Sequence, residues 1–425
     1  MMINQTEIKN SIISYKSYYY IIPIFLYFIL IFLLSRNIPI SDDYSMLTLI
    51  IDIINSDSPY EQLSYIFQQH NEHRIATTKI IFYFYYLIFG DINFKSLIFL
   101  GNLFQLITFY LLISFFKIDN YKNFILLAVS LIYFSFGSAE SSLMAMAAIS
   151  NYLVVTLMLM AIYFVNKDQK YSLILALLFS IAAVYTQGNG LIAPFIISGY
   201  LMAKKLYSKG VVAFFIAIIF IYVYMLGYVS TNGHGDPLEL IKKPFEILLF
   251  MVSFIGSAFG FGGSHYPILT KISLVFTLLL GTSIIFLTAR FCIIGKLPFN
   301  SPFLWLNIFV FLTALITALS RLNFGISQSM VSRYHMYSIL ATVSTIGIIS
   351  NDEQLKIMVN RSIKKVKYIF YIAIPLYYLA SFTFLIYFYA FFYSPDRNGG
   401  YIYPGRDHQH AIEILRLSKT YGVFN

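Results

Sequence analysis

The sequence predicts an all-α fold: one transmembrane domain over residues 1–425, built as a helical bundle of about eleven spanning helices. The first observation behind this prediction is composition, because 59% of the residues are hydrophobic and only 11% are charged. A soluble domain needs more charged surface to stay solvated. The second is that apolar runs of about 17–25 residues, long enough to cross a hydrocarbon core of about 30 Å, recur along the whole chain.

The third observation is that basic residues fall on one side of the membrane. Lys9 and Lys16 precede the first apolar run, residues 18–35, so the positive-inside rule predicts a cytoplasmic N-terminus. The polar stretch that follows, residues 36–95, is then an external loop with interfacial helices, and residues 394–425 form an external C-terminal tail. The abundance of Ile, Phe, Tyr, Lys and Asn is typical of an AT-rich genome, which favours a bacterial inner membrane.

Two apolar runs are predicted not to span. Ile75–Gly90 carries Lys79 and reaches only about 24 Å as a helix. If it spanned, three basic linkers would become external and break the positive-inside rule, so we expect an interfacial helix. Pro244–Gly262 is expected to be non-spanning or re-entrant by the same logic. The three linkers are residues 117–122, 167–170 and 204–209.

This threading accounts for the net charge of +10. The cytoplasmic segments carry 16 Lys and Arg against 5 acidic residues, and the external segments carry 13 against 14. The excess charge therefore reflects membrane orientation and predicts no nucleic-acid partner. All seven histidines fall on the external side, so groups that titrate or bind ligands gather on one face.

The first external loop holds the strongest candidates for chemistry. It opens with Asp42 and Asp43, two adjacent carboxylates that are costly to hold beside hydrocarbon. A carboxylate here can act as general base on an acceptor hydroxyl, or help to bind a divalent cation. The alternative is structural, since Ser41, Asp42 or Asp43 could cap a helix that runs through Ile54.

The same loop ends with an acid, a titratable group and a phosphate-binding fork in succession, Glu72, His73 and Arg74. The alternative is the polar start of a helix that faces lipid headgroups. His70 and His73 lie three residues apart, so a helix would place both on one face. Two histidines alone are a weak metal signal, and the single cysteine, Cys292, excludes a multi-cysteine site, so we predict no metal ligands.

Later external segments add one acid and two arginines. Glu140 stands alone between long apolar segments, with small neighbours that would let a substrate approach, or it caps the short helix that follows. Arg321 and Arg333 lie at the outer ends of two consecutive spans, where a guanidinium can bind a lipid phosphate through two hydrogen bonds. Snorkelling to ordinary headgroups is the alternative. Tyr334 and His335 extend this polar group.

Two further observations narrow the function classes. Residues 187–190, with the sequence Gln-Gly-Asn-Gly, predict a tight external turn. Its glycines are explained first by the backbone conformation of the turn, and a functional role is the second interpretation. No Walker motif, Rossmann fingerprint or zinc-ligand cluster appears in its expected context, which argues against an ATP-driven pump and against a soluble nucleotide cofactor.

This arrangement resembles the GT-C type of membrane glycosyltransferases. The resemblance rests on an acidic pair just after the first span, an external loop with interfacial helices, and many further spans. Ile75–Gly90 looks like the juxtamembrane helix of the aminoarabinose- and mannosyl-transferring branches. The stretches 71–74 and 332–334 look similar to envelope members that decorate O-antigen, a part of lipopolysaccharide, with glucose from undecaprenyl-phosphate-glucose.

The resemblance implies a function for these residues. Asp42 or Asp43 would be the catalytic base, and Glu140 would correspond to a second acid. The donor would be a sugar on a polyprenyl phosphate, held by Arg74, Arg321 or Arg333, and the acceptor a glycan or lipid-linked sugar outside the membrane. Transfer would invert the anomeric carbon in one displacement. No cofactor is required, although a divalent cation would be compatible with the carboxylates.

Two other functions remain open. An O-antigen polymerase or ligase also uses undecaprenyl-linked sugars, but typically depends on a large later external loop, whereas here the richest loop is the first. A flippase or transporter of lipid-linked sugars would carry ionisable groups within its spans, which are nearly free of them here. Both comparisons favour the glycosyltransferase.

Overall fold

The computed structural model describes residues 19–117, 122–167, 169–229, 241–261, 267–295, 298–355, 357, 367–393 and 408–424. The regular secondary structure of these residues is helical. An isolated antiparallel bridge between His70 and His73 is the exception among them. Within these described ranges, seven helical stretches are long and apolar enough to cross a membrane. They are α6 (Phe94–Ser114), Ile125–Ser142 with α7 (Lys122–Tyr133), α9 (Ala145–Lys167), α12 (Tyr207–Met225), α15 (Pro267–Ile294), α16 (Pro302–Arg321) and α19 (Lys367–Tyr393).

Shorter apolar helices accompany these seven. They are α2 (Ile21–Leu34), α5 (Ala76–Phe89), α10 (Ser172–Val184), α11 (Ala193–Ala203) with the preceding 3-10 helix η3 (Gly188–Ile192), and α14 (Pro244–Ile255). A further helix, α17 (Ser332–Asn351), is less apolar. The structure thus confirms a helical, multi-pass membrane protein, and the number of about eleven spans stays a prediction.

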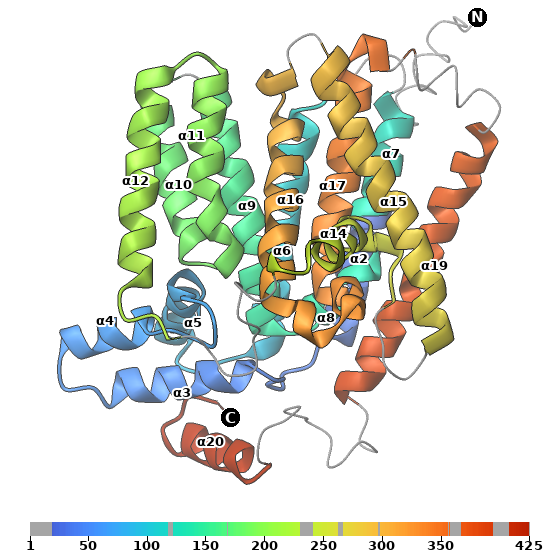
Figure 1. The fold of residues 1–425 in the computed structure, drawn as a ribbon. Coiled ribbons are helices and arrows are strands. Elements are labelled where there is room, and N and C mark those ends of the chain that lie inside the picture. Colours follow the sequence, from blue (N-terminus) through green and yellow to red (C-terminus); the bar gives the residue numbers. More distant parts are fainter. Residues whose placement is uncertain are drawn as a thin grey trace, which may run out of the picture.

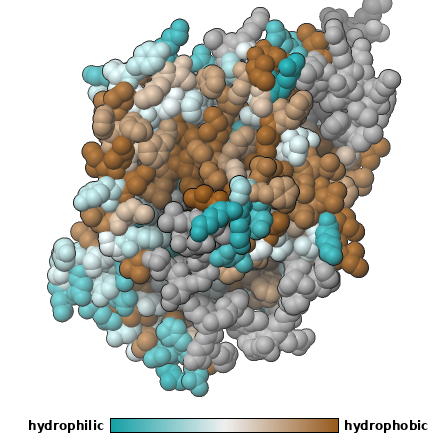
Figure 2. All heavy atoms as spheres, in the orientation of Figure 1, coloured by the Kyte–Doolittle hydropathy of each residue, from teal (hydrophilic) through white to brown (hydrophobic). Residues whose placement is uncertain are grey.

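The bundle carries a separate layer of short helices at one end. In Figure 1, α9 to α12, α16 and α17 stand side by side, and α3 (Asp43–Ile54) and α4 (Pro59–Phe67) lie across their lower end. The helix α14 is seen end-on in front of the lower half of α16 and α17, so it runs across its neighbours (Figure 1). Figure 2 shows hydrophobic side chains spread over the middle of the visible face, with hydrophilic ones on the layer of α3 and α4.

The centre of the bundle is α9, the most deeply buried of the seven apolar stretches in the described residues. Small residues let α6 approach it closely, because a Cβ on Gly101 would lie 2.7 Å from Ala148 Cβ. Helices in membranes pack through such small residues, since lipid offers no hydrophobic drive for association. The resulting close contact fixes the start of α9, which carries part of the candidate site.

The run Ile75–Gly90 forms the helix α5, whose interfacial position stays a prediction, and local chemistry explains its limits. It ends at Gly90, whose φ of 79° is the left-handed conformation that glycine adopts easily. Its lysine is buried, and Lys79 Nζ donates to the carbonyl oxygens of Tyr65 and Gln68, each at 2.8 Å. These carbonyls lie at the end of α4, where the helix dipole favours a cation. Lys79 therefore joins α4 to α5.

The C-terminal helix α20 (His408–Thr420) packs on this layer. Ala411 and Ile414 are buried, and α20 lies against α3 (Figure 1). Beyond it, the amide of Ile92 donates to the carbonyl oxygen of Val423 at 2.7 Å. The predicted external tail thus includes an ordered helix on the same end of the bundle as α3, while residues 394–407 lie outside the described ranges.

Candidate functional site

One pair of charged residues joins the second predicted external loop to the start of α17. Arg333 Nε lies 3.4 Å from Glu140 Oε1, and the Arg333 amide donates to Glu140 Oε2 at 3.2 Å. Ser332 also joins the two segments, because its hydroxyl accepts a hydrogen bond from the Glu140 amide and donates one to the Gly137 carbonyl. Glu140, predicted from a lone acid between apolar segments, lies in the short helix α8 (Ala139–Ser142). The pair is partly exposed and faces the end of the bundle that carries α3.

The two aspartates of the first loop have different surroundings. Asp43 is fully buried, with Oδ1 accepting from the Met146 amide at 2.7 Å and Oδ2 from the Ile40 amide at 3.1 Å. Met146 lies in the first turn of α9, where amides have no partner within the helix and the dipole favours an anion. Asp42 is half-buried, and its charge acts on Arg333. Asp43 therefore joins the start of α3 to α9, whereas Asp42 is the aspartate whose charge acts on Arg333.

A second pair lies next to the first. Arg321, the last residue of α16, forms an ion pair with Glu72, and His73 Nε2 lies 3.7 Å from the same carboxylate oxygen. Arg321 also interacts electrostatically with Arg333 and Tyr334, so the two pairs belong to one cluster. We call Asp42, Glu72, Glu140, Arg321 and Arg333 the charged cluster.

The charged cluster unites residues that the sequence placed in separate segments. Its five members come from the start of α3, the 70–73 turn, α8, the end of α16 and the start of α17. Tyr334 lies beside it on α17, whereas His335 is fully buried, with Nε2 3.0 Å from the Met330 carbonyl oxygen. Three carboxylates and two guanidinium groups at one end of an apolar bundle can bind a phosphate and accept a proton.

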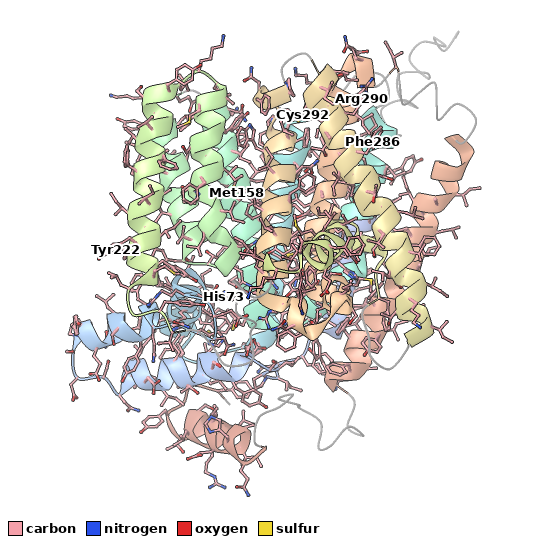
Figure 3. The ribbon with its side chains drawn as sticks, viewed as in Figure 1. His73, Met158, Tyr222, Phe286, Arg290 and Cys292 are labelled. Carbon is pink, nitrogen blue, oxygen red and sulfur yellow. The ribbon has the colours of Figure 1, made fainter. Side chains whose placement is uncertain are left out.

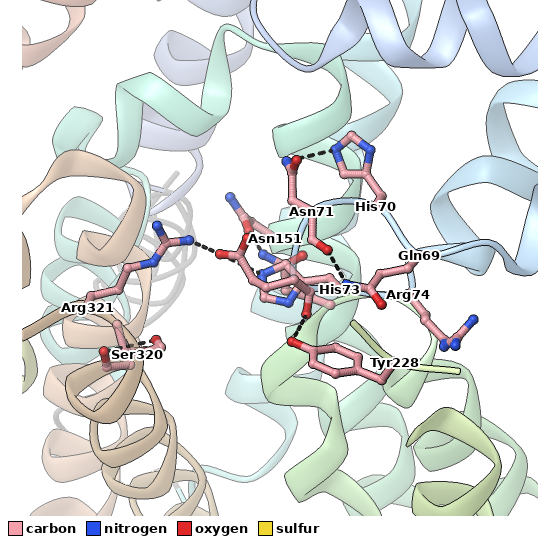
Figure 4. A network of polar contacts seen from close by, with 12 residues as sticks. Gln69, His70, Asn71, His73, Arg74, Asn151, Tyr228, Ser320 and Arg321 are labelled. Carbon is pink, nitrogen blue, oxygen red and sulfur yellow. Dashed lines mark hydrogen bonds and ion pairs between the residues drawn. The ribbon is translucent and has the colours of Figure 1, made fainter. Parts of the chain in front are cut away.

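Arg74 is not part of this cluster. Its Nε donates to the Tyr224 carbonyl at 2.8 Å, Nη1 to the Phe67 carbonyl at 2.8 Å, and Nη2 to the Leu226 carbonyl at 2.5 Å. Figure 4 shows Arg74 and Arg321 on opposite sides of His73. Because its guanidinium serves the carbonyl ends of α4 and α12, we leave Arg74 out of the proposed phosphate site.

The stretch before Arg74 is a turn, where a helix was the alternative prediction. His70 and His73 exchange two backbone hydrogen bonds of 2.7 and 2.9 Å, and Asn71 between them has a φ of 48°. The side chains of His70 and His73 therefore do not share a helix face. His73 instead packs on Gly188, where an added Cβ would meet the imidazole. Gly188 is therefore required by the close approach of the His73 imidazole, in addition to the turn geometry that the sequence predicted.

A buried hydrogen-bond network supports the loop that carries Glu140. The Tyr27 hydroxyl donates to Asn102 Oδ1 at 2.6 Å and lies 2.8 Å from Ser142 Oγ. Asn102 Nδ2 donates to the Ser142 carbonyl at 2.9 Å, and the Tyr152 hydroxyl lies 2.6 Å from Ser142 Oγ. These groups come from α2, α6, α8 and α9, so three other helices hold α8 in place. Such networks rigidify a structure when every member is paired.

The described residues contain no group of three or more His, Cys, Asp and Glu side chains placed to hold a metal ion. We therefore derive no step through a cation. Comparisons with protein-family models, curated proteins and solved structures found no match to the chain. The function must accordingly be argued from the charged cluster and its surroundings.

Proposed function

We propose that the protein is a glycosyltransferase of the bacterial inner membrane, which moves a sugar from an undecaprenyl-phosphate-sugar to an extracytoplasmic acceptor such as O-antigen or another envelope glycan. The observation that carries this proposal is the charged cluster. It gathers three carboxylates and two arginines at one end of an apolar helical bundle, beside a layer of short helices. This is where the phosphate of a membrane-bound donor would meet a soluble acceptor.

In the proposed reaction, Asp42 is the general base. It takes the proton of an acceptor hydroxyl, whose oxygen attacks the anomeric carbon of the sugar. The bond between that carbon and the phosphate oxygen breaks, and the lipid phosphate leaves with the electron pair. One displacement inverts the anomeric carbon. Asp42 is preferred over Asp43 because it is partly exposed, whereas both oxygens of Asp43 already accept backbone hydrogen bonds.

Arg321 and Arg333 would hold the phosphate and stabilise its growing charge. A guanidinium carries five N–H donors, so pairing with Glu72 or Glu140 leaves donors for phosphate oxygens. Glu140 would keep Arg333 oriented, and Glu72 with His73 would do the same for Arg321. The cluster thus contains a base and a phosphate site, the two parts that the reaction requires.

The proposed topology places the charged cluster outside the cell. It uses eleven spans, α2, α6, α7, α9 to α12, α15 to α17 and α19, with α5 and α14 at the outer surface. The crosswise orientation of α14 supports this assignment (Figure 1). Arg290, predicted to be cytoplasmic, and His73, predicted to be external, lie at opposite ends of the bundle in Figure 3. The N-terminal lysines that set the orientation lie outside the described residues.

The test is sugar transfer in membranes that contain the protein, supplied with labelled undecaprenyl-phosphate sugars and envelope acceptors. We expect Asp42→Asn to abolish transfer with unchanged expression. Asp57→Asn, the same change at an exposed position of the same loop, is the matched control and should transfer normally. Normal transfer by Asp42→Asn would remove Asp42 as the base. If the wild type moved no sugar from any donor, a polymerase, ligase or flippase would replace the proposal.

A further inference from the structure

A set of neutral polar side chains lies next to the charged cluster. Gln187 Nε2 donates to Asn151 Oδ1 at 3.1 Å, and Asn151 Nδ2 donates to Ser141 Oγ at 3.0 Å. Ser141 follows Glu140 in the chain, so this row of hydrogen bonds starts beside the charged cluster. Figure 4 shows Asn151 next to His73. Ser141 therefore links these amides to the short helix that carries Glu140.

A second group of polar contacts joins η3 to α16 and α17. Asn189 Nδ2 donates to the Tyr337 hydroxyl at 2.9 Å and lies 3.4 Å from Thr313 Oγ1. Between Gln187 and Asn189 lies Gly188, on which His73 packs. Tyr337 is about 6 Å further along the axis of α17 than Arg333, at a rise of about 1.5 Å per residue. We call Asn151, Gln187, Asn189 and Tyr337 the amide layer.

One atom of the amide layer points to a ligand. Asn189 is 9% exposed, and its Oδ1 is a buried acceptor with no hydrogen-bond donor within reach among the described residues. A buried carbonyl oxygen without a donor lowers stability, so a ligand that supplied a donor would offset this cost. A hydroxyl group is the simplest donor that would satisfy it.

We infer that the amide layer binds the sugar of the donor through its hydroxyl groups. This inference rests on the proposed function. The chemistry divides in two: the arginines suit an anionic phosphate, while uncharged amides and a phenol suit a neutral, hydroxyl-rich ring one bond away from it. Gln187 is half-buried and lies at the accessible side of the layer, and Asn189 lies deeper. A neutral hexose is therefore favoured over a charged sugar.

The experiment compares two lipids on the purified full-length protein in nanodiscs. One is undecaprenyl phosphate, and the other is undecaprenyl phosphate that carries glucose, galactose or mannose. The wild type should bind at least one of the three sugar-bearing lipids more tightly than the bare lipid. In Asn189→Leu, which keeps the size but removes both polar atoms, binding of that lipid should weaken by about tenfold. Binding of bare undecaprenyl phosphate should stay unchanged.

The chain offers a matched control in Asn307. It is also a buried asparagine with an unpaired Oδ1 in the described residues, but its Nδ2 bonds to Thr288 and Thr345 within α15 to α17. Asn307→Leu should leave the preference for the sugar-bearing lipid intact. If Asn189→Leu does not fold, Gln187→Leu at the half-buried position serves as the second variant, with the same expected loss.

The outcomes separate the inference from the proposed function. A wild type that binds neither kind of lipid overturns both. A wild type that binds bare undecaprenyl phosphate and prefers none of the three hexoses overturns the inference alone. The inference alone is also overturned if both variants keep the preference for the sugar-bearing lipid. It is likewise overturned if the variants lose affinity for both lipids equally, because Asn189 would then act only through the fold.

Discussion

Replacing Arg74 should destabilise the protein while leaving its affinity for a phosphate-bearing lipid intact. The guanidinium donates to the carbonyl oxygens of Phe67, Tyr224 and Leu226. These oxygens lie at the ends of α4 and α12, where carbonyls have no partner within the helix. Arg74 therefore satisfies two helix ends at once, and Arg74→Gln removes both the charge and most of the hydrogen bonds.

The magnitude follows from these three bonds. A hydrogen bond to a buried charged group contributes about 1.5–3 kcal/mol, and a partly exposed one nearer 0.5–1 kcal/mol. Arg74 is half-exposed, so three bonds and the favourable helix dipoles give about 2–3 kcal/mol for Arg74→Gln. The comparison variant is Arg333→Gln. Its ion pair with Glu140 is 49% exposed on the arginine side, and such pairs contribute about 0–1 kcal/mol.

The assay measures thermal unfolding of both variants in detergent, together with binding of undecaprenyl phosphate. We expect Arg74→Gln to unfold at a lower temperature and to bind the lipid normally when folded. Arg333→Gln should unfold near the wild-type temperature and bind the lipid more weakly. If Arg74→Gln unfolded like the wild type and lost lipid binding, the structural role given to Arg74 would be refuted, and it would return to the phosphate site.

Three further predictions concern the supports of the site. Burial raises the pKa of Asp43 from 3.8 to about 7, because desolvation outweighs the backbone hydrogen bonds that favour its anion. The contribution of Asp43 to stability is therefore present below pH 4 and lost as the pH rises towards 7, and the unfolding temperature of the wild type, relative to Asp43→Asn, should fall over that range. Tyr27→Phe removes the buried hydrogen bonds to Asn102, Ser142 and Gln105 and should lower the free energy of unfolding by about 1–3 kcal/mol in thermal or denaturant unfolding, with slower sugar transfer because α8 loosens. Removing residues 408–425 uncovers α3 and should speed proteolysis of the predicted first external loop in intact spheroplasts, a change that Glu413→Gln on the exposed face of α20 should not cause.

Local patterns predicted the elements well. The run Ile75–Gly90 became the helix Ala76–Phe89, because its length, its apolar content and the final glycine all act within the segment. The residues of the charged cluster were likewise found by type, since an acid or arginine at the edge of an apolar run is costly unless it has a use. The sequence thus identified charged residues that are out of place beside apolar runs.

The partners of those residues were beyond such patterns. Asp43 accepts from an amide in α9, about a hundred residues later, and Arg74 donates to carbonyls in α12. In both cases the partner is a backbone atom, which has no sequence signature. The unpaired oxygen of Asn189 was hidden for a related reason. The Gln-Gly-Asn-Gly stretch reads as a turn, and only the fold brings Tyr337 beside it.

The order of charges along the chain has a consequence for synthesis. Asp42, Glu72 and Glu140 all precede the middle of the chain, whereas Arg321 and Arg333 follow much later. At ~5–20 residues per second, the roughly 180 residues between Glu140 and Arg321 delay the first arginine by roughly ten to forty seconds. During that interval Glu72 and Glu140 lack the arginines with which they pair in the folded protein. A chaperone or insertase that remains with the nascent bundle until α16 enters the membrane would protect it at this stage.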